Sequence, residues 1–165
     1  MNDELLIQRA SQYAVSRNLQ LAERLGFGIH GIVYSAENKV VHGKTAIKVL
    51  RESEFFEREL EAYYRLREDR VEKVLGFHVP ALVDYDDELC AIEMTLVTRP
   101  FVLDFAGAYL DHMPEFSQEI WDDWDQQKRD QFGARWPMVE NVLAELRRFD
   151  IYMVDVSPSN ISFLD

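Results

Sequence analysis

The chain has 165 residues, enough for one domain or a small two-lobed unit with a sizeable hydrophobic core. Its 30 Asp and Glu residues against 18 Lys and Arg residues give a formal net charge of −12 at pH 7. Because this charge repels phosphate backbones and anionic lipid headgroups, we expect neither nucleic acid nor a membrane surface as a partner.

A single cysteine, Cys90, lies within an apolar run and has no second cysteine with which to form an internal disulfide. No stretch approaches the roughly 18 apolar residues of a membrane span. We therefore expect a cytoplasmic protein in a reducing compartment. The histidines show no metal-ligand spacing with Cys90, and we expect none of them to bind a metal: His30, which we expect to be exposed, His42, His78 and His112.

Two elements are predicted before the first glycine of interest. Residues 3 to 16 place apolar side chains on one side of a short helix, which we expect to pack on the outside of a sheet. Residues 19 to 25 then alternate apolar and polar side chains, which is typical of a strand half buried in a sheet.

This strand leads into three glycines at the spacing G-x-G-x-x-G: Gly26, Gly28 and Gly31. Glycine has no Cβ, so the backbone can pass tightly and point its N–H groups at an anion. In a dinucleotide-binding unit the last glycine opens a helix, whereas here Ile32-Val33-Tyr34 continues as a strand. The pattern favours a nucleotide-binding hairpin, and an ordinary hairpin stays open as the alternative.

A third predicted strand follows a polar turn and carries a lysine. On residues 46 to 50, alternation puts Lys48 on the same face as Ala46 and Leu50. An ammonium group in such apolar company needs a partner of opposite charge. The helix predicted over residues 51 to 67 offers these candidates: Glu52, Glu54, Glu57, Glu59 and Glu61.

Strand, glycine loop, strand, turn and lysine-bearing strand together resemble the nucleotide-binding hairpin of protein kinases. The resemblance is carried by these positions: Gly26, Gly28, Gly31, Val33 and Ala46-Ile47-Lys48. It implies that a helix glutamate pairs with Lys48, which then reaches the phosphates of ATP. The family pattern favours Glu59, seven residues before Leu66, while Glu57 and Glu61 stay open.

Two further strand-like runs, residues 77 to 85 and 89 to 97, complete the five strands and one helix that the resemblance implies. The second run would end at the hinge, where backbone groups between Glu93 and Val97, among them those of Glu93 and Thr95, would bond the adenine edge. Adenine would lie under a roof formed by Val33 and Ala46.

The segment from residue 98 to 135 has the weakest pattern. Residues 101 to 110 are apolar enough for a helix or for a stretch along the hinge. We expect Trp121, Trp124 and Trp136 to pack in the core and between the lobes. Pro137 suits a first helical turn, and the apolar side chains after it recur at helical spacing.

Asp155 and Asn160, followed by a short predicted strand, match the D-x-x-x-x-N pattern of the kinase catalytic loop. The resemblance implies that Asp155 accepts the proton of a hydroxyl acceptor, and that Asn160 holds a Mg²⁺ ion and braces the loop. Taken alone, Asp155 is equally suited to open a turn at Ser157-Pro158-Ser159.

The chain departs from the family pattern at several points. Met153-Val154 stand where His-Arg is usual, and Ser157 takes a position often held by a lysine. Ser162 replaces an apolar residue expected beneath adenine. No D-F-G segment, whose aspartate holds Mg²⁺, follows Asn160, and we expect Asp165 to cap a turn rather than replace that ligand.

The expected fold is α+β and protein-kinase-like, with a small lobe over residues 1–97 and a hinge plus a truncated, mainly helical lobe over residues 98–165. The resemblance implies an ATP-binding phosphotransferase that uses Mg²⁺ and acts on a protein, as serine/threonine-type kinases do, or on a small molecule. Two alternatives are a non-catalytic pseudokinase that senses nucleotide or binds a protein partner, and the front part of a longer kinase.

Overall fold

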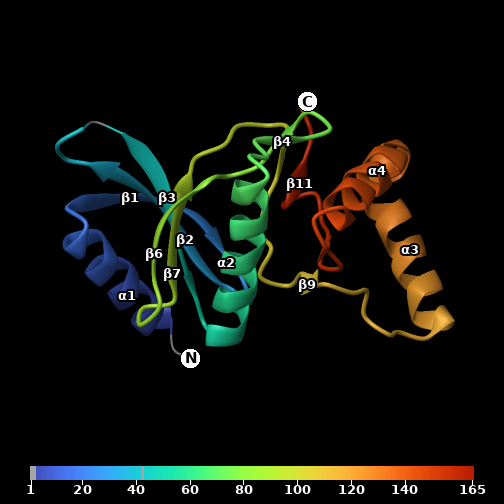
Figure 1. Ribbon diagram of the computed structural model, residues 1–165, viewed down its shortest axis with the longest axis horizontal. Helices are drawn as coiled ribbons and strands as arrows, with labels where there is room; N and C mark the ends of the chain where they lie inside the picture. The colour runs from blue at the N-terminus through green and yellow to red at the C-terminus, as the bar shows by residue number, and fades with distance from the viewer. Residues whose placement is uncertain (1–2, 42) are drawn as a thin grey trace.

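A five-stranded antiparallel sheet lies at one end of the molecule (Figure 1). Its strand order is β1-β2-β3-β7-β6, with the bounds β1 Leu19–Phe27, β2 Gly31–Asn38, β3 Lys44–Leu50, β7 Ala91–Thr95 and β6 Leu82–Asp86. This computed structural model describes residues 3–41 and 43–165, so His42 lies outside the described residues. The predicted α+β class and the predicted five-stranded sheet are confirmed.

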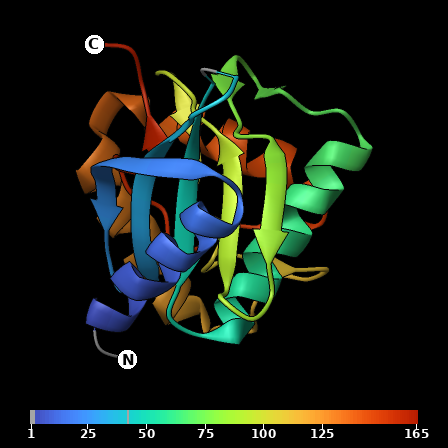
Figure 2. The same ribbon diagram turned by 90° about the vertical axis from the view of Figure 1, so that its left-hand side faces the viewer.

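Helices cover the two faces of this sheet. α1, Asp3–Ser16, lies across the outer face, as Figure 2 shows, and packs with Ile47 and Val49 of β3. α2, Ser53–Glu68, packs on the other face, where Ala46 and Leu50 belong to its cluster. The predicted alternation of β3 is thus confirmed, because its two faces enter separate hydrophobic clusters.

Short strands connect the sheet to the rest of the chain. A second sheet has the order β11-β8-β5-β4, with the bounds β4 Lys73–Val74, β5 Phe77–His78, β8 Phe101–Val102 and β11 Ile161–Ser162. A third consists of β9 Tyr109–Leu110 and β10 Ile151–Tyr152, which are antiparallel. Segments far apart in sequence, near residues 100 and 160, therefore lie side by side.

One predicted strand differs from the structure, and one of two alternatives for residues 101 to 110 is excluded. The run from 77 to 85 is not one strand, because β5 and β6 belong to different sheets and Pro80, which lacks an N–H donor, lies between them. Residues 101 to 110 form no helix: their backbone pairs with distant segments through β8 and β9. This extended path brings residues 104 to 107 into the middle of the molecule.

The remaining helices are α3, Gln118–Phe132, a 3-10 turn at Gly133–Arg135, and α4, Trp136–Arg147. The Ser117 side chain caps α3 by accepting a hydrogen bond from the Ile120 N–H. Pro137 stands in the first turn of α4, as predicted. The ring of Trp124 packs against those of Trp121 and Trp136, with centroids 5.6 and 5.7 Å away. The expected core packing is confirmed for Trp136, while Trp124 is partly buried against the same cluster.

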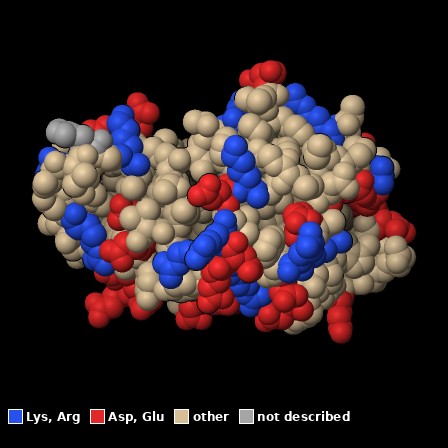
Figure 3. Space-filling model, turned by 45° about the horizontal axis from the view of Figure 1, so that its top comes forward, with Lys and Arg blue, Asp and Glu red and all other residues tan. Residues whose placement is uncertain are grey.

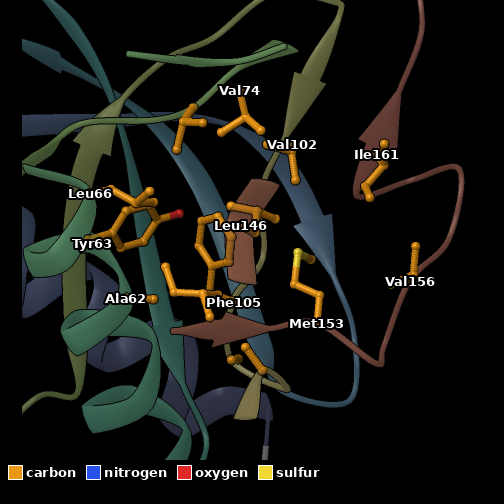
Figure 4. Close-up of a cluster of buried hydrophobic side chains, with 14 of the residues drawn as sticks. Ala62, Tyr63, Leu66, Val74, Val102, Phe105, Leu146, Met153, Val156 and Ile161 are labelled. Carbon is orange, nitrogen blue, oxygen red and sulfur yellow. The ribbon is translucent and has the colours of Figure 1, made fainter. Parts of the chain in front are cut away.

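One hydrophobic cluster joins the sheet to these helices (Figure 4). The Phe105 ring lies within it, edge-on to the Tyr63 ring of α2 with 5.4 Å between the ring centroids. Leu146 of α4 and Met153, which precedes the predicted catalytic loop, belong to the same cluster. The loop is therefore held against α2 through a shared core.

The helices in residues 3–41 and 43–165 include none that is long and apolar enough to cross a lipid bilayer. On the face shown in Figure 3, Lys and Arg side chains are interspersed with Asp and Glu side chains. Charge of one sign does not gather on that face.

Candidate functional site

Lys48 lies at the centre of a buried cluster of charges. Its Nζ is 2.6 Å from Glu59 Oε2 and 2.7 Å from Asp104 Oδ1. The side chain of Lys48 is 7% exposed and that of Glu59 is 0% exposed, whereas that of Asp104 is 34% exposed. The predicted pairing of Lys48 with Glu59 is confirmed, while Glu61 pairs with Arg65 on the surface of α2.

The surroundings shift the pKa values of these three groups in different ways. Burial by itself lowers the pKa of Lys48, but the carboxylates of Glu59 and Asp104 raise it above its ordinary value. Burial raises the pKa of Glu59, against the influence of Lys48. Burial also opposes ionisation of Asp104, but Lys48 lowers the pKa of that carboxyl below its ordinary value. Of the two carboxyl groups, Asp104 is therefore the more readily ionised and Glu59 the less.

Asp104 is a residue of this cluster that the sequence analysis missed. It follows β8, which pairs with β11, and the Leu103 N–H beside it donates to the Asn160 carbonyl at 2.9 Å. The available signal is the run Asp104-Phe105-Ala106-Gly107, an Asp-Phe pair with a glycine close behind. In the kinase pattern the D-F-G segment follows the catalytic loop. This run precedes the predicted catalytic loop, so the order of the family pattern does not point to it.

The predicted catalytic loop is braced by Asn160. Its Oδ1 accepts a hydrogen bond from the Ser157 N–H, and its Nδ2 donates to the Asp155 carbonyl, each at 2.7 Å. The bracing role expected of Asn160 is thus confirmed. The Asp155 side chain, 57% exposed, stays outside these bonds and faces Gly107, where an added Cβ would lie 3.2 Å from the Asp155 Cβ.

The tip of the glycine loop contacts the predicted catalytic loop. His30 Nε2 lies 3.4 Å from Asp155 Oδ2, and the His30 ring packs on Phe55 of α2 with 4.4 Å between centroids. The expectation that His30 is exposed is wrong, since only 14% of its side chain is accessible. The Arg51 N–H, just after β3, donates to the His30 carbonyl at 2.9 Å and ties the tip of the loop to the end of that strand.

The three glycines of the loop differ in what surrounds them. A Cβ on Gly31 would lie 2.1 Å from the Val49 carbonyl oxygen, so only glycine fits against β3 there. A Cβ on Gly28 would meet nothing within 4 Å. Gly26 pairs with Val33, whose side chain packs on the same cluster as Ala46. Val33 and Ala46 thus lie on the face of the sheet that carries Lys48.

Glu93 and Thr95 are not brought together with the other predicted site residues. Glu93 pairs in register with Ile47, on the α1 face, and accepts hydrogen bonds from Tyr13 Oη at 3.1 Å and Thr45 Oγ1 at 2.7 Å. The Thr95 N–H donates to the Ala81 carbonyl at 2.9 Å. Neither side chain faces Lys48, and Met94 between them has the inward side chain.

Comparison with models of known protein families found no match, and comparison with curated proteins found no similar chain. The site is therefore interpreted from its geometry.

The acidic residues that the structure describes in this region do not form a metal cage. Within residues 3–41 and 43–165, no three His, Cys, Asp or Glu side chains form a group that could hold a metal ion. Asp165, considered above as a turn cap, lies in an exposed ion pair with Arg99 at 3.3 Å. The arrangement instead offers the carboxylate of Asp104, which follows Leu103, the residue whose N–H donates to the Asn160 carbonyl at 2.9 Å.

Proposed function

We propose that this chain is a protein-kinase-like, ATP-binding phosphotransferase that transfers the γ-phosphate to a hydroxyl acceptor. The observation that carries the proposal is the buried pair of Lys48 and Glu59, 2.6 Å apart and next to the glycine loop. Removing each of the two charged groups from water costs on the order of several kcal/mol. A buried pair of this kind is therefore retained more readily where it serves a function.

Each residue has a role in this reaction. Lys48, oriented by Glu59, binds the phosphates from the strand side, with the open backbone of Gly28 above them. The acceptor oxygen forms a bond to the γ-phosphorus as the bond from that phosphorus to the bridging oxygen breaks. Asp155 takes the proton of the acceptor hydroxyl, and ADP leaves with the bridging oxygen.

The residues present fit a Mg²⁺ ion. Mg²⁺ in nucleotide sites is usually held by one or two protein groups plus substrate phosphates, so a cage of three carboxylates is not needed. Asp104 and Asn160 are oxygen ligands of the required kind, and the ion supplies neutralisation of phosphate charge when bound. Asp104-Phe105 with Gly107 thus takes the part of D-F-G, in a different chain order.

A specific contact favours the second candidate, a non-catalytic pseudokinase that binds nucleotide or a protein partner. Asp155 Oδ2 lies 3.4 Å from His30 Nε2, so the carboxylate that would act as base is occupied by the glycine loop. A transferase requires that this contact opens when substrate binds.

The test is a thermal-shift titration with Mg-ATP on the wild type, Lys48→Met and Lys44→Met. A ligand at 100 times its dissociation constant stabilises the folded state by about 2.7 kcal/mol. We expect stabilisation of the wild type and of Lys44→Met, because Lys44 is exposed on the same strand and forms an exposed ion pair with Glu37. Lys48→Met should show none.

Phosphate transfer separates the two candidates. The wild type should transfer labelled phosphate from ATP to a hydroxyl acceptor. The Asp155→Asn variant should lose this transfer. Nucleotide binding without any transfer would favour the pseudokinase, and no stabilisation of the wild type at millimolar Mg-ATP would contradict both nucleotide-binding forms of the proposal.

A further inference from the structure

A cavity of about 380 Å³ lies beside the predicted catalytic loop and outside the candidate site. It is lined by Pro158 of that loop, by β11 and by the end of α3, and Figure 1 shows β11 on the side of the molecule that carries α3 and α4. Lys48, Asp155 and Val33, part of the expected adenine roof, do not line it. Its volume is within the range of about 300–1,000 Å³ that is usual for pockets that bind small molecules.

The polar side chains that line this cavity are mostly hydrogen-bond donors. Arg99 enters from the segment before β8, and Arg135 enters from the 3-10 turn before α4. Lys128 Nζ donates to Gln131 Oε1 at 3.4 Å, which leaves the side-chain N–H groups of Gln131 available to a ligand. The Ser162 hydroxyl has no hydrogen-bond partner in the part of the chain that the structure describes. Donors gathered in this way suit an oxyanion.

Arg135 is held by an aromatic ring and not by a carboxylate. Its guanidinium lies over the Phe163 ring, 5.0 Å from the centroid, and Phe163 in turn packs edge-on against Phe77. Among the described residues, no Asp or Glu side chain forms an ion pair with Arg135. Because the ring covers a face of the planar guanidinium, the N–H groups at its edge can bind a carboxylate or a phosphate in a bidentate manner.

Asp165 supplies the carboxylate among the described residues that line the cavity, and it shows what Arg99 binds. Its Oδ2 lies 3.3 Å from Arg99 Nη1, and its side chain is 91% exposed. So exposed an ion pair contributes little to stability, and an anion from solution can replace the Asp165 carboxylate at small cost. Two guanidinium groups against one carboxylate leave the cavity positive, in a chain whose formal net charge is −12.

We propose that this cavity binds a small molecule that carries a carboxylate or phosphate group on a compact apolar body. Arg99 and Arg135 bind the oxyanion that the two groups share, and the apolar body packs on Phe132, Pro158 and Ile161, which complete the lining. The inference goes beyond the proposed function, because none of these residues takes part in phosphate transfer.

The test is an NMR titration with three probes that share an aromatic ring: benzoate, phenyl phosphate and the neutral benzyl alcohol, at constant ionic strength. We expect benzoate or phenyl phosphate to shift the backbone amide signals of residues 131 to 135 and 161 to 163 saturably at millimolar concentration. Benzyl alcohol should bind about 10-fold more weakly or less, because it lacks the charge that the arginines bind. The anion that binds more tightly identifies the group as a carboxylate or a phosphate.

Three variants locate the binding. Arg135→Gln and, independently, Arg99→Gln should each weaken binding of the anionic probe about 10-fold, because each removes a charged donor. Asp165→Asn should strengthen it, because it removes the carboxylate that competes for Arg99. The matched control is Arg67→Gln, since Arg67 is exposed and lies over the Tyr64 ring at 4.8 Å but does not line the cavity. It should leave the affinity unchanged.

Four results overturn the proposal: no saturable shift in the wild type, equal binding of the neutral and anionic probes, wild-type affinity in both cavity arginine variants, or an equal loss in Arg67→Gln. The last result would show attraction to positive charge in general. Both cavity arginines are exposed, and the amide spectrum of each variant checks that its fold is kept. Since the probes contain no nucleotide, each result holds whether or not the chain binds ATP.

Discussion

Lys48 shows how strongly the surroundings of a charged side chain decide its energetic role. Lys44 and Lys48 lie on one strand, four residues apart, and each has a carboxylate within 3.0 Å. The Lys44 pair with Glu37 is exposed, and such pairs contribute about 0–1 kcal/mol. The Lys48 pair is buried, and loss of one partner from a buried pair costs about 3–5 kcal/mol.

Lys48→Met should therefore lower the free energy of unfolding by about 3–5 kcal/mol, because it leaves Glu59 buried without its cation. The double variant Lys48→Met/Glu59→Met should regain much of that loss, since the fully buried carboxylate is removed and only Asp104, whose side chain is 34% exposed, is left without the cation. Urea unfolding of the single and double variants measures both values. Lys44→Met is the control and should change stability by about 1 kcal/mol or less; a similar cost at both lysines would contradict the prediction.

Asp104 gives a prediction with a pH dependence. Lys48 lowers the pKa of Asp104 in the folded chain below its ordinary value of 3.8, so the unfolded chain binds more protons on acidification. The stability that Asp104 contributes is thus present above pH 3.8 and lost as the pH falls through the lower, folded pKa. Unfolding measured from pH 7 to pH 2.5 should show wild type more stable than Asp104→Asn at neutral pH, with the difference shrinking below pH 3.8.

The control for this prediction is Asp111→Asn, because Asp111 forms a pair with Arg65 at 2.9 Å but its side chain is 71% exposed. Its effect on stability should be small across the same pH range. A difference between wild type and Asp104→Asn that stays constant down to pH 2.5 would show that Asp104 is not held ionised by Lys48.

At the scale of elements, the β2–β3 hairpin depends on one glycine. Gly31→Ala places a Cβ 2.1 Å from the Val49 carbonyl oxygen, so the two strands must separate, and we expect a cost of at least about 1–3 kcal/mol. Gly28→Ala is the matched control, since its Cβ enters open space and should change stability by about 0.5 kcal/mol or less. Thermal unfolding of both variants checks this, and equal stability of the two would contradict it.

Elements with a regular hydrophobic period were predictable from the sequence. The alternation on β3 and the helical spacing on α2 and α4 depend on neighbours in the chain, and the structure has these elements where they were expected. The need of Lys48 for a carboxylate was also predictable, but local pattern left Glu57, Glu59 and Glu61 open, and only the resemblance to the kinase pattern favoured Glu59. The structure decides among them, because Glu59 is the buried glutamate of α2.

The position of Asp104 was not predictable in the same way. Its place is set by the pairing of β8 with β5 and β11, which lie about 25 and 60 residues away along the chain. Strands of two residues are also too short to leave a periodic signal in the sequence. The face on which the Glu93 side chain lies also depends on distant pairing, because its register with β3 decides it and a shift of one residue exchanges the two faces. The expected adenine contact of Glu93 and Thr95 concerns their backbone groups and stays a prediction.

At the scale of the whole molecule, the sheet and the helices share one hydrophobic cluster. Its members come from β3, α2, β8, α4 and β10, and Phe105 lies among them with its ring fully buried. A shared core makes separate unfolding of the two parts unfavourable, because either part would expose the apolar surface of the other. The buried charges of Lys48, Glu59 and Asp104 lie beside this cluster and depend on its integrity.

Phe105→Ala should therefore destabilise both parts together, by about 3–5 kcal/mol, through the cavity it leaves. Fluorescence reports on the helical part, since Trp121, Trp124 and Trp136 all lie on α3 and α4, and amide hydrogen exchange of β2 and β3 reports on the sheet. We expect the stability of the helical part, measured by fluorescence, and the stability of the sheet, measured by amide exchange, to fall by the same amount. Phe116→Ala is the control, because that ring is 37% exposed and its loss should cost about 1 kcal/mol. Loss of fluorescence at a temperature where the strand amides stay protected would show instead that the two parts fold independently.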